Sequence, residues 1–531
     1  MSETFPKRDE KGKFPLGKIY RTRPLLPWGS LVSGKYLDSE RRKKPVVPVR
    51  FVQACVNGHI SDINWHRFVH NDPDSKCPGQ LWLDEGGSGN DFADIFVRCE
   101  ACKKRRPLWD ATVPNGKVLG VCLGFSPWLG LKAQQLCLNK KTELPLYNRL
   151  LVRSASNAYF SQVLSVISIP DSDAKLQEAV NLVYDDFLQY AESASDVKKE
   201  RRKQKVSVAL EKFSDEAVWE EIQRRQSGQQ NQTHSIKQAE IETLLSSPTE
   251  LGEDVPEGDF YARSRNLDKL KPEFSSRIER IVLLHRLREV LAQVGFTRFE
   301  AEMPDIDGEL DINVRRADLD IEPSWVPAIE NRGEGVFIAF RKEAIEDWLK
   351  RDAVVKRGQE LARGFDIWCM RKGIDQEKDK AKFPGLPYIM LHSLSHLVIT
   401  AVSLECGYAA SSIRERIYAG EAGYGIMLYT GSSGSEGTLG GLQEVGKHIE
   451  YHLELALEQG KLCSNDPVCA QHKPDNEQEE RFLHGSACHG CLLIAETSCE
   501  RRNEFLDRAL VVSTVEALGA EFFPEYTAFC I

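Results

Sequence analysis

The feature that most constrains how this chain folds is the grouping of its cysteines. Of its 14 cysteines, six lie within Cys55–Cys137 and five within Cys463–Cys499. Each group contains one pair separated by two residues, Cys99–Cys102 and Cys488–Cys491. This spacing places two sulfurs on one turn, which is the arrangement that a tetrahedral zinc ion needs. Cysteines clustered in this way in a long intracellular chain are more typical of metal sites than of disulfides.

In the C-terminal group we expect four ligands to enclose one zinc ion. Such a closed site leaves no open position for water, so it is structural rather than catalytic, and it can contribute about 10 to 16 kcal/mol of apparent folding free energy. The alternative is a set of unrelated buried cysteines that pack as small hydrophobes. The expected ligands are Cys469, Cys488, Cys491 and Cys499, with Cys463 as the alternative fourth ligand and His472, His484 and His489 as further substitutes.

The N-terminal group offers more candidates than one zinc ion needs, and we expect a second structural zinc ion here. Its ligands are four residues from the set Cys77, Cys99, Cys102, Cys122 and Cys137. The favoured combination is Cys99, Cys102 and Cys122, completed by either Cys77 or Cys137. Cys55 and His59 form a further Cys-x3-His pair in the same region.

Basic residues follow directly after the first cysteine pair, at Lys103, Lys104, Arg105 and Arg106. On a rigid zinc domain these side chains are candidates for contacting nucleic-acid phosphates, with Trp109 available to stack on a base. The alternative is a charged turn that is simply solvated.

The length and charge of the chain restrict the classes of function. With 531 residues, it is long enough for about two to four domains. Its net charge of -9 provides no global attraction to nucleic acid, so any contact with DNA needs local basic patches. There is no apolar run of about 18 residues and no apolar core of a signal peptide near the N-terminus. We therefore expect a soluble cytoplasmic protein that makes no contact with a membrane.

The expected fold class is α+β and multidomain, with an N-terminal zinc-stapled β-rich domain, a central helical region and a C-terminal mixed α/β zinc-binding domain. The expected divisions are an irregular basic arm at 1–45, a zinc-binding β-rich domain at 46–170, a charged helical insertion or linker at 171–275, an α/β domain at 276–380 and a C-terminal zinc-binding domain at 381–531. Within the insertion, residues 193–259 are polar enough to form an exposed helical insertion or a mobile linker.

Periodicity predicts individual elements. Apolar residues recur at helical spacing from Ile281 to Val294 and predict a helix that ends at Gly295. Short runs typical of strands occur at 46–52, 80–83, 95–98, 118–122, 336–340 and 425–430. Further helices are expected at 343–363, 387–404 and 442–457.

Two motifs suggest catalysis. The residues from Gly441 to His448 nearly match a phosphate-binding loop, but histidine stands where a hydroxyl should bind magnesium, so a glycine-rich turn that packs a strand on a helix is favoured. His392 and His396 lie one helical turn apart and face the same way. The residue after His392 is Ser393, which excludes the zinc-protease motif, so two core or interface histidines are favoured over a metal or phosphate contact.

Several segments resemble a known family. They are Phe51-Val-Gln-Ala-Cys55, His59-Ile-Ser-Asp-Ile-Asn-Trp65, Ser126-Pro-Trp-Leu-Gly130 and Asn331-Arg-Gly-Glu-Gly-Val-Phe337. This set resembles DrmB, a family of subunits of the DISARM antiphage defence system. The C-terminal stretch carries Leu391-His-Ser-Leu-Ser-His396, Arg414-Glu-Arg-Ile-Tyr418 and Ala487-Cys-His-Gly-Cys491-x7-Cys499. That stretch is similar to the zinc-binding C-terminal domain of MrfA-type DNA-repair helicases, which is also present in DrmB.

The resemblance implies a non-enzymatic partner of a superfamily 2 helicase of the DrmA type. In MrfA-like proteins the domain is fused to the helicase, whereas this sequence has no Walker A with Walker B motif and no DEAH-like box. The leading hypothesis is therefore an accessory subunit that docks on a DNA helicase and helps to hold invading DNA. One alternative is a metal-dependent nuclease or phosphodiesterase that uses His392, His396 and the 434–441 loop. The other is a DNA-binding regulator that acts without a helicase.

Overall fold

The computed structural model describes residues 20–72, 75–86, 91–113, 117–130, 132–139, 142–169, 172–211, 213–226, 235–246, 249–252, 254–255, 258–299, 316–322, 324–377, 381–406, 409–431, 441–479 and 481–526. The chain forms two compact units. The first contains the described residues of Met1–Val163, Gln293–Met303 and Ile312–Pro327, and the second contains those of Leu164–Ala292 and Ala328–Ile531. Both units mix helix with sheet, and the first is rich in strands, so the predicted fold class is confirmed.

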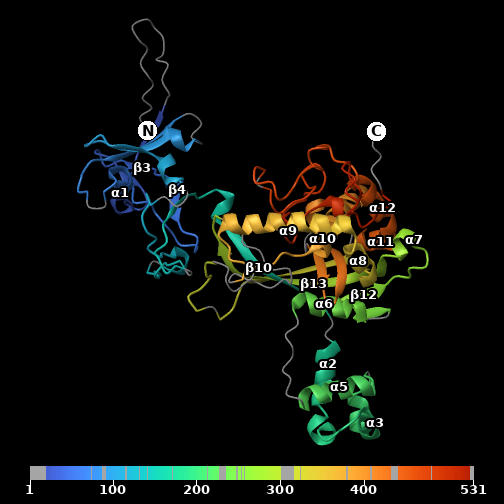
Figure 1. Ribbon diagram of the computed structural model, residues 1–531. Helices are drawn as coiled ribbons and strands as arrows, with labels where there is room; N and C mark the ends of the chain where they lie inside the picture. The colour runs from blue at the N-terminus through green and yellow to red at the C-terminus, as the bar shows by residue number, and fades with distance from the viewer. Residues whose placement is uncertain are drawn as a thin grey trace. The chain divides into compact units, whose positions relative to one another are not determined.

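The first unit is built from short antiparallel strands, some of which are labelled in Figure 1. One sheet has the order β1 (Tyr20–Pro24), β6 (Leu81–Gly86), β7 (Ile95–Cys99) and β8 (Arg105–Pro107). A second has the order β5 (Ile60–Ser61), β4 (Phe51–Ala54) and β9 (Arg149–Val152), and a third pairs β2 (Tyr36–Leu37) with β3 (Lys43–Lys44). Helix α1 (Trp65–His70) packs on this framework, and the buried Phe68 contributes to its apolar core.

Two segments of the first unit differ from the predictions. Tyr20 pairs with Gly86 in the register of β1 and β6, so part of the segment predicted to be an irregular arm is a sheet strand, while residues 1–19 lie outside the described part. The run predicted as a strand at 118–122 forms only a single bridge, between Val121 and Tyr147. Both differences arise because pairing partners distant in the sequence decide whether an extended segment becomes a strand.

The second unit is organised by one large sheet. Its strands lie in the order β11 (Glu250–Gly252), β12 (Tyr261–Ser264), β13 (Ile278–Thr297), β14 (Ala328–Phe340), β16 (Gly423–Thr430) and β15 (Ile413–Gly420), and β10 (Phe160–Ile167) also pairs with β13. The end of β13 and the start of β10 belong to the first unit. The strands predicted at 336–340 and 425–430 are confirmed within β14 and β16.

The helix predicted at Ile281–Val294 is wrong, because these residues form most of β13. Alternate residues of this strand enter two different apolar cores: Ile281 packs with one and Val282 with the other. When both faces of a strand are buried, the alternation of apolar and polar residues disappears and the run looks continuously apolar. The chance spacing of its leucines then imitates a helix.

Helices cover both faces of this sheet, and Figure 1 shows α6 and α10 on opposite sides of it. The helices of the second unit include α6 (Ile236–Ser246), α7 (Pro272–Ser275), α8 (Lys342–Leu349), α9 (Asp352–Lys372), α10 (Leu386–Cys406), α11 (Gly441–Lys447) and α12 (Ile449–Gly460). The helix predicted at 343–363 is split between α8 and α9, and that predicted at 442–457 is split between α11 and α12. The helix predicted at 387–404 is confirmed as α10.

Helix α10 lies in the larger apolar core. Among the described residues, one helix segment, Leu386–Leu404 of α10, has the length and apolar composition that would allow it to cross a membrane. Within this segment 83% of the residues are buried inside the chain. The central helix of a globular core has the same composition.

The segment predicted to be an exposed insertion or linker has two parts. Helices α2 (Ser172–Asn181), α3 (Ala194–Glu200), α4 (Gln204–Ala209) and α5 (Asp215–Gln226) pack around a small apolar core of their own. Helix α6 is instead part of the main fold, since Ile241 and Leu244 are buried against the sheet. Its Glu240 accepts two hydrogen bonds from the buried Arg416 of β15, at 2.6 and 2.8 Å. The linker prediction is therefore wrong for α6.

The described residues of 461–526 contain little regular secondary structure apart from a short 3-10 turn at Arg508–Leu510. The segment is nonetheless well anchored. Arg508 is fully buried and donates hydrogen bonds to the carbonyls of Gly460 and Lys461 at 2.9 and 3.1 Å. Asp507, also buried, accepts from Arg357 of α9 at 2.7 Å. Buried charged side chains and clustered cysteines hold this segment, whereas backbone hydrogen bonds of the sheet and helices hold the rest of the unit.

Candidate metal centres

Side chains that can bind a metal ion gather in four places among the described residues. In each place four ligand atoms lie within 4.8 Å of one another. We name the places by their position in the fold. The hairpin centre is Cys55, His59, Cys122 and Cys137; the knuckle centre is His70, Cys77, Cys99 and Cys102; the four-cysteine centre is Cys463, Cys469, Cys488 and Cys491; and the buried histidine centre is His392, His396, Glu415 and Cys499.

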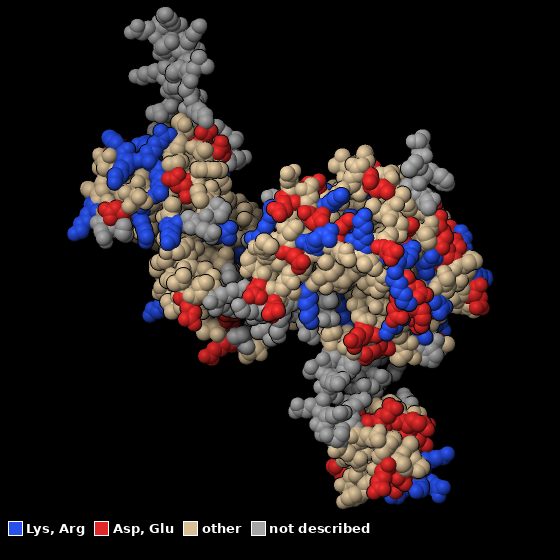
Figure 2. Space-filling model, viewed as in Figure 1, with Lys and Arg blue, Asp and Glu red and all other residues tan. Residues whose placement is uncertain are grey.

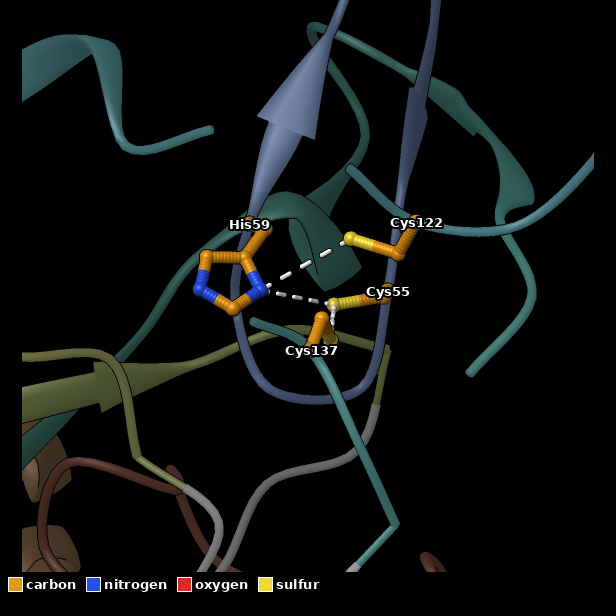
Figure 3. Close-up of side chains that lie close together, drawn as sticks. All are labelled: Cys55, His59, Cys122 and Cys137. Atoms are coloured by element: carbon orange, nitrogen blue, oxygen red, sulfur yellow. Dashed lines mark hydrogen bonds between the residues drawn. The ribbon is translucent and has the colours of Figure 1, made fainter. Parts of the chain in front are cut away.

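The hairpin centre is organised by the tight turn between β4 and β5. The N–H of Cys55 donates to the carbonyl of His59 at 3.1 Å, so both side chains project from one turn. Gly58 in this turn has φ +87°, and a Cβ atom there would lie 2.4 Å from that of Ala317, so only glycine fits. Figure 3 shows the thiol of Cys122, from a separate segment, pointing toward the ring of His59, as the thiol of Cys55 does.

The distances in the hairpin centre suit a tetrahedral metal ion. The sulfur of Cys55 lies 3.4 Å from Nδ1 of His59 and 3.6 Å from the sulfur of Cys137. Ligand atoms around a tetrahedral zinc ion lie roughly 3.2 to 3.8 Å apart. Nε2 of His59 lies 2.8 Å from the side-chain amide of Gln135, while Nδ1 faces the sulfurs. With Nδ1 bound to a metal ion, the Nε2–H group would donate to the oxygen of this amide and hold the ring.

The electrostatics of the hairpin centre also favour a cation. Hydrogen bonds from Cys137 and Cys55 lower the pKa of Cys122. The neighbouring Cys122 in turn raises the pKa of Cys55, and it raises the pKa of Cys137 to about 11. Thiolates this close repel one another, so only one of the three ionises readily alone. A bound divalent cation would stabilise all three thiolates together.

The knuckle centre lies where β7 ends. Cys99 is the last residue of β7, and its sulfur lies 3.5 Å from that of Cys77. Burial raises the pKa of Cys99, but hydrogen bonds from the backbone of Cys102 and from the sulfur of Cys77 outweigh it and lower this pKa to about 6. A thiol with this pKa is largely ionised at neutral pH and ready to bind a metal.

His70 completes the knuckle centre from the end of α1. Its Nδ1 atom donates to the carbonyl of His66 at 2.8 Å, whereas its buried Nε2 atom has no hydrogen-bond partner among the described residues. A buried polar atom without a partner costs about 1 to 3 kcal/mol. Coordination by Nε2 would remove this cost, so the residues present fit a metal ion.

The four-cysteine centre lies in the irregular C-terminal segment. The sulfur of Cys488 lies 3.3 Å from that of Cys463 and 3.8 Å from that of Cys491, and the sulfurs of Cys469 and Cys491 are also 3.8 Å apart. Burial raises the pKa of Cys463 to about 11, whereas a hydrogen bond from Cys491 lowers that of Cys469 to about 6. This is the same conflict between neighbouring thiols as in the hairpin centre.

The ligand sets differ from those expected from the sequence. In the C-terminal group the structure brings Cys463 to Cys469, Cys488 and Cys491, and it places Cys499 in the buried histidine centre instead. The chain turns back toward α10 after Cys491, which carries Cys499 away from the other sulfurs. In the N-terminal group, Cys122 and Cys137 join Cys55 and His59, while Cys77 stays with Cys99 and Cys102. One expected N-terminal site is therefore two groups.

Some of the residues in these centres could be recognised from the sequence and others could not. The Cys-x3-His pair of Cys55 and His59 was visible as a motif. His70 carries no such signal, because only the packing of α1 brings it to the cysteines. Glu415 is one of many carboxylates in the sequence, and its burial beside His392 and His396 follows from the pairing of β15 in the sheet.

Comparison with known proteins assigns the two cysteine-rich regions to families. Residues 394–492 match the profile described as MrfA Zn-binding domain. Residues 17–160 match a domain of unknown function, DUF8724. A curated relative, the DISARM protein DrmB of Bacillus paralicheniformis, is 33% identical over 487 residues, which cover 90% of this chain and 82% of the relative. The chain belongs to the DrmB family.

Among solved structures, the crystal structure of the DUF1998 helicase MrfA bound to DNA matches 45% of this chain, with a TM-score of 0.21 and 12% identity. The match spans 25% of the length of that chain.

The matched zinc-binding domain and the Cys and His clusters together establish that this DrmB-family chain carries structural zinc. The matched domain contains all members of the four-cysteine centre. The expectation of structural zinc is therefore confirmed, and the geometry offers more than one place for it.

The basic residues after the knuckle are partly engaged within this DrmB-family fold. Arg106 donates to Asp110 at 2.8 Å and to the carbonyl of Phe68 at 3.1 Å. Lys104 donates to the carbonyl of His70 at 3.2 Å, and the guanidinium of Arg105 lies over the ring of Phe96. Both side chains, like that of Lys103, are nevertheless exposed. Arg106 therefore holds β8 to α1, whereas the other three remain candidates for contact with nucleic acid.

The segment that resembles a phosphate-binding loop is helix α11. Lys447, the residue that would contact a phosphate, lies on this helix and pairs with Glu444. At Gly446 a Cβ atom would lie 2.5 Å from Cδ2 of Leu283, so glycine is needed for close packing of the helix on β13. The packing interpretation is favoured over the nucleotide-binding one. Residues 432–440 lie outside the described part of the chain.

Proposed function

We propose that this chain is a non-catalytic accessory subunit that docks on a superfamily 2 helicase of the DrmA type in the cytoplasm and helps to hold foreign DNA during DISARM defence. The observation that carries the proposal is the 33% identity to the DISARM protein DrmB along 90% of the chain. A similarity over 90% of the chain reaches well beyond the matched zinc-binding domain at 394–492.

The proposed ligands of the structural zinc ions are the members of the hairpin, knuckle and four-cysteine centres. In the second unit, the zinc ion of the four-cysteine centre would fix the segment 461–526, which has few backbone hydrogen bonds of helices or strands. The exposed residues near it include Leu462 and Val468, which are 61% and 77% exposed. Apolar side chains on a rigid loop suit contact with another protein. We propose that this face binds the helicase.

The burial of two histidines inside the second unit supports an accessory role over the nuclease alternative. His392 and His396 are 0% exposed, so neither can reach a phosphodiester in this conformation. Their ring nitrogens face Glu415 and Cys499 rather than a cleft. The segment that resembles a nucleotide-binding loop is helical. These contacts favour a chain that binds and positions rather than one that hydrolyses.

Contact with DNA would use local groups of basic side chains. Figure 2 shows Lys and Arg side chains gathered on the visible face of the first unit, whereas acidic and basic side chains are interspersed on the second. Lys103, Lys104 and Arg105 are exposed and belong to the first unit. Their charge would attract phosphates without reading the sequence of the DNA.

Co-purification tests the helicase partnership. The tagged full chain is expressed together with the helicase gene that neighbours it, and the helicase recovered on the tag is quantified. We expect recovery with the wild-type chain and with Cys369→Ser, a buried cysteine in α9 outside the four centres. We expect more than tenfold less helicase with Cys488→Ser/Cys491→Ser. No helicase band with the wild-type chain would refute the partnership.

A binding assay on the purified complex tests the DNA contact. Replacing Lys103, Lys104 and Arg105 with alanine should raise the Kd for duplex DNA at least tenfold and flatten its dependence on salt. The matched control removes three other exposed basic residues, Lys198, Lys199 and Lys203, which we expect to leave Kd unchanged. Equal effects of both triple variants would argue against a specific basic face. DNA binding by the chain alone, as tight as that of the complex, would favour the stand-alone regulator.

A further inference from the structure

The buried histidine centre gathers four metal-binding side chains from three separate segments of the second unit. His392 and His396 lie one turn apart on α10, Glu415 lies on β15, and Cys499 lies in the C-terminal segment. The side chains of the two histidines and of Glu415 are 0% exposed. The matched zinc-binding domain, residues 394–492, contains His396 and Glu415 but neither His392 nor Cys499, so it covers only half of this centre.

The distances within the centre are short and converge on one point. Nε2 of His392 lies 3.0 Å from Oε1 of Glu415 and 3.1 Å from the sulfur of Cys499. Nε2 of His396 lies 3.1 Å from the same Oε1 atom. These separations are slightly below the roughly 3.2 to 3.8 Å between ligand atoms of a tetrahedral zinc ion. A small outward movement of each side chain would accommodate the ion.

Contacts on the far side of each imidazole ring fix which nitrogen carries the proton. Nδ1 of His392 donates to the carbonyl of Phe505 at 3.2 Å, and Nδ1 of His396 donates to the carbonyl of Leu492 at 2.8 Å. A carbonyl oxygen can only accept, so Nδ1 is the protonated nitrogen of each neutral ring. Both Nε2 lone pairs then face the carboxylate. Histidines that bind metals are typically held by such a contact from the other ring nitrogen.

Lone pairs that face one another in this way repel unless a cation lies between them. Oε1 of Glu415 is directed at both Nε2 atoms, and its Oε2 atom accepts from the hydroxyl of Ser395. Without a metal ion, both rings would need an extra proton to donate to the carboxylate. Burying two imidazolium charges in an apolar core is costly.

The sulfur of Cys499 has the backbone surroundings of a zinc ligand. It accepts hydrogen bonds from the N–H groups of Arg501 at 3.3 Å and Asn503 at 3.1 Å. In the four-cysteine centre, Cys488 accepts in the same way from the N–H two residues later, at 3.3 Å. Such N–H groups stabilise a thiolate rather than a thiol. Cys499 is therefore prepared as a ligand although it stands apart from the other cysteines.

We infer that the buried histidine centre binds a zinc ion of its own, in addition to that of the four-cysteine centre in the same unit. Its ligands are two neutral imidazoles, one carboxylate and one thiolate. The two negative ligands balance the charge of the divalent ion, so the buried site is neutral overall. Nitrogen, oxygen and sulfur ligands in a tetrahedral set suit zinc. Four protein ligands leave no place for water, so the ion clamps α10, β15 and the C-terminal segment together. This inference stands independently of the proposed helicase partnership.

Cadmium substitution in the wild-type full chain tests the site without any mutation. The chain is produced with 113Cd, and its NMR spectrum is recorded, because the chemical shift of bound 113Cd depends on how many thiolates surround it. We expect one resonance from a site with a single thiolate, in addition to resonances from the sulfur-rich centres. A spectrum that contains only resonances of sites with three or four thiolates would overturn the inference.

Zinc analysis of variants provides the second test. Cys499→Ala should contain one zinc ion fewer per chain than the wild type, whereas Cys369→Ala, a buried cysteine outside the four centres, should keep the full number. If Cys499→Ala folds and keeps the wild-type zinc content, the buried histidine centre binds no zinc ion and the inference is wrong. If the variant fails to fold, the 113Cd spectrum of the wild type still decides between the two outcomes.

Discussion

A ring nitrogen of His70 lies within 4.8 Å of the sulfur of Cys99, and the buried Nε2 atom of this histidine has no hydrogen-bond partner among the described residues. We expect Nε2 to bind the zinc ion of the knuckle centre. His70→Ala should therefore release zinc to a chromogenic chelator at least tenfold faster than the wild type. His70→Cys replaces the nitrogen ligand with a thiolate and should restore slow release. Equal release rates for the wild type and His70→Ala would show that His70 is not a ligand.

The stability of the second unit should depend on pH because the imidazole of His484 is buried in it. Burial lowers the pKa of this histidine from 6.5 to about 4, while its Nε2 atom donates to the carbonyl of Asn503. Between these two values the unfolded chain binds more protons than the folded chain, so stability falls as pH drops from 6.5 to 4. The shift corresponds to about 3 kcal/mol.

This contribution can be separated from acid release of zinc by comparing two proteins. Urea unfolding of the wild type and of His484→Gln is followed between pH 7 and pH 4.5. Loss of zinc affects both proteins alike, so the difference between their slopes isolates His484. We expect the wild type to lose stability more steeply, and parallel curves would contradict the role given to this histidine.

A side chain at position 446 should force the side chain of Leu283 to move, because helix α11 packs closely on β13. A Cβ atom there would lie 2.5 Å from Cδ2 of Leu283. Alanine is a better helix former than glycine by about 1 kcal/mol, yet we expect Gly446→Ala to destabilise the chain by about 1 to 3 kcal/mol through overpacking. The matched control is Gly420→Ala, where the added atom meets nothing within 4 Å. A stabilised Gly446→Ala variant would refute the packing interpretation of this motif.

The buried pair of Arg416 and Glu240 should hold α6 to the sheet. Arg416 is 6% and Glu240 2% exposed in their side chains, and their nearest atoms are 2.6 Å apart. Removing one partner leaves an uncompensated buried charge, so Glu240→Leu or Arg416→Leu should each cost about 3 to 5 kcal/mol. The double variant should cost less than the sum of the two. Strictly additive losses in a double-mutant cycle would show that the pair is not coupled.

The sequence alone indicated where zinc binds but not which residues share an ion. The pairs Cys99–Cys102 and Cys488–Cys491 could be recognised because the ligands of one knuckle are neighbours in the sequence. Whether Cys463 or Cys499 completes the C-terminal set depends on how the chain turns after Cys491. That path is determined by contacts with α10, such as the hydrogen bond from His392 to the carbonyl of Phe505.

The same limit explains the error at β13. Its leucines satisfy the spacing of an amphipathic helix, but they are buried on both faces of a sheet whose other strands come from distant parts of the sequence. The helix α10 was predictable because the mainly apolar stretch Leu386–Leu404 is too long for a typical strand. Local patterns therefore predict elements that stand alone, whereas strands with two buried faces need their partners to be known.

The four-cysteine centre should hold the structural zinc ion that fixes the irregular C-terminal segment. The most direct measurement is the zinc content per chain of the purified full-length protein and of Cys488→Ser/Cys491→Ser, determined by mass spectrometry. We predict one zinc ion fewer in the variant, accompanied by rapid proteolysis within residues 461–526. Equal zinc content in the two proteins, with this segment still resistant to protease, would contradict the account.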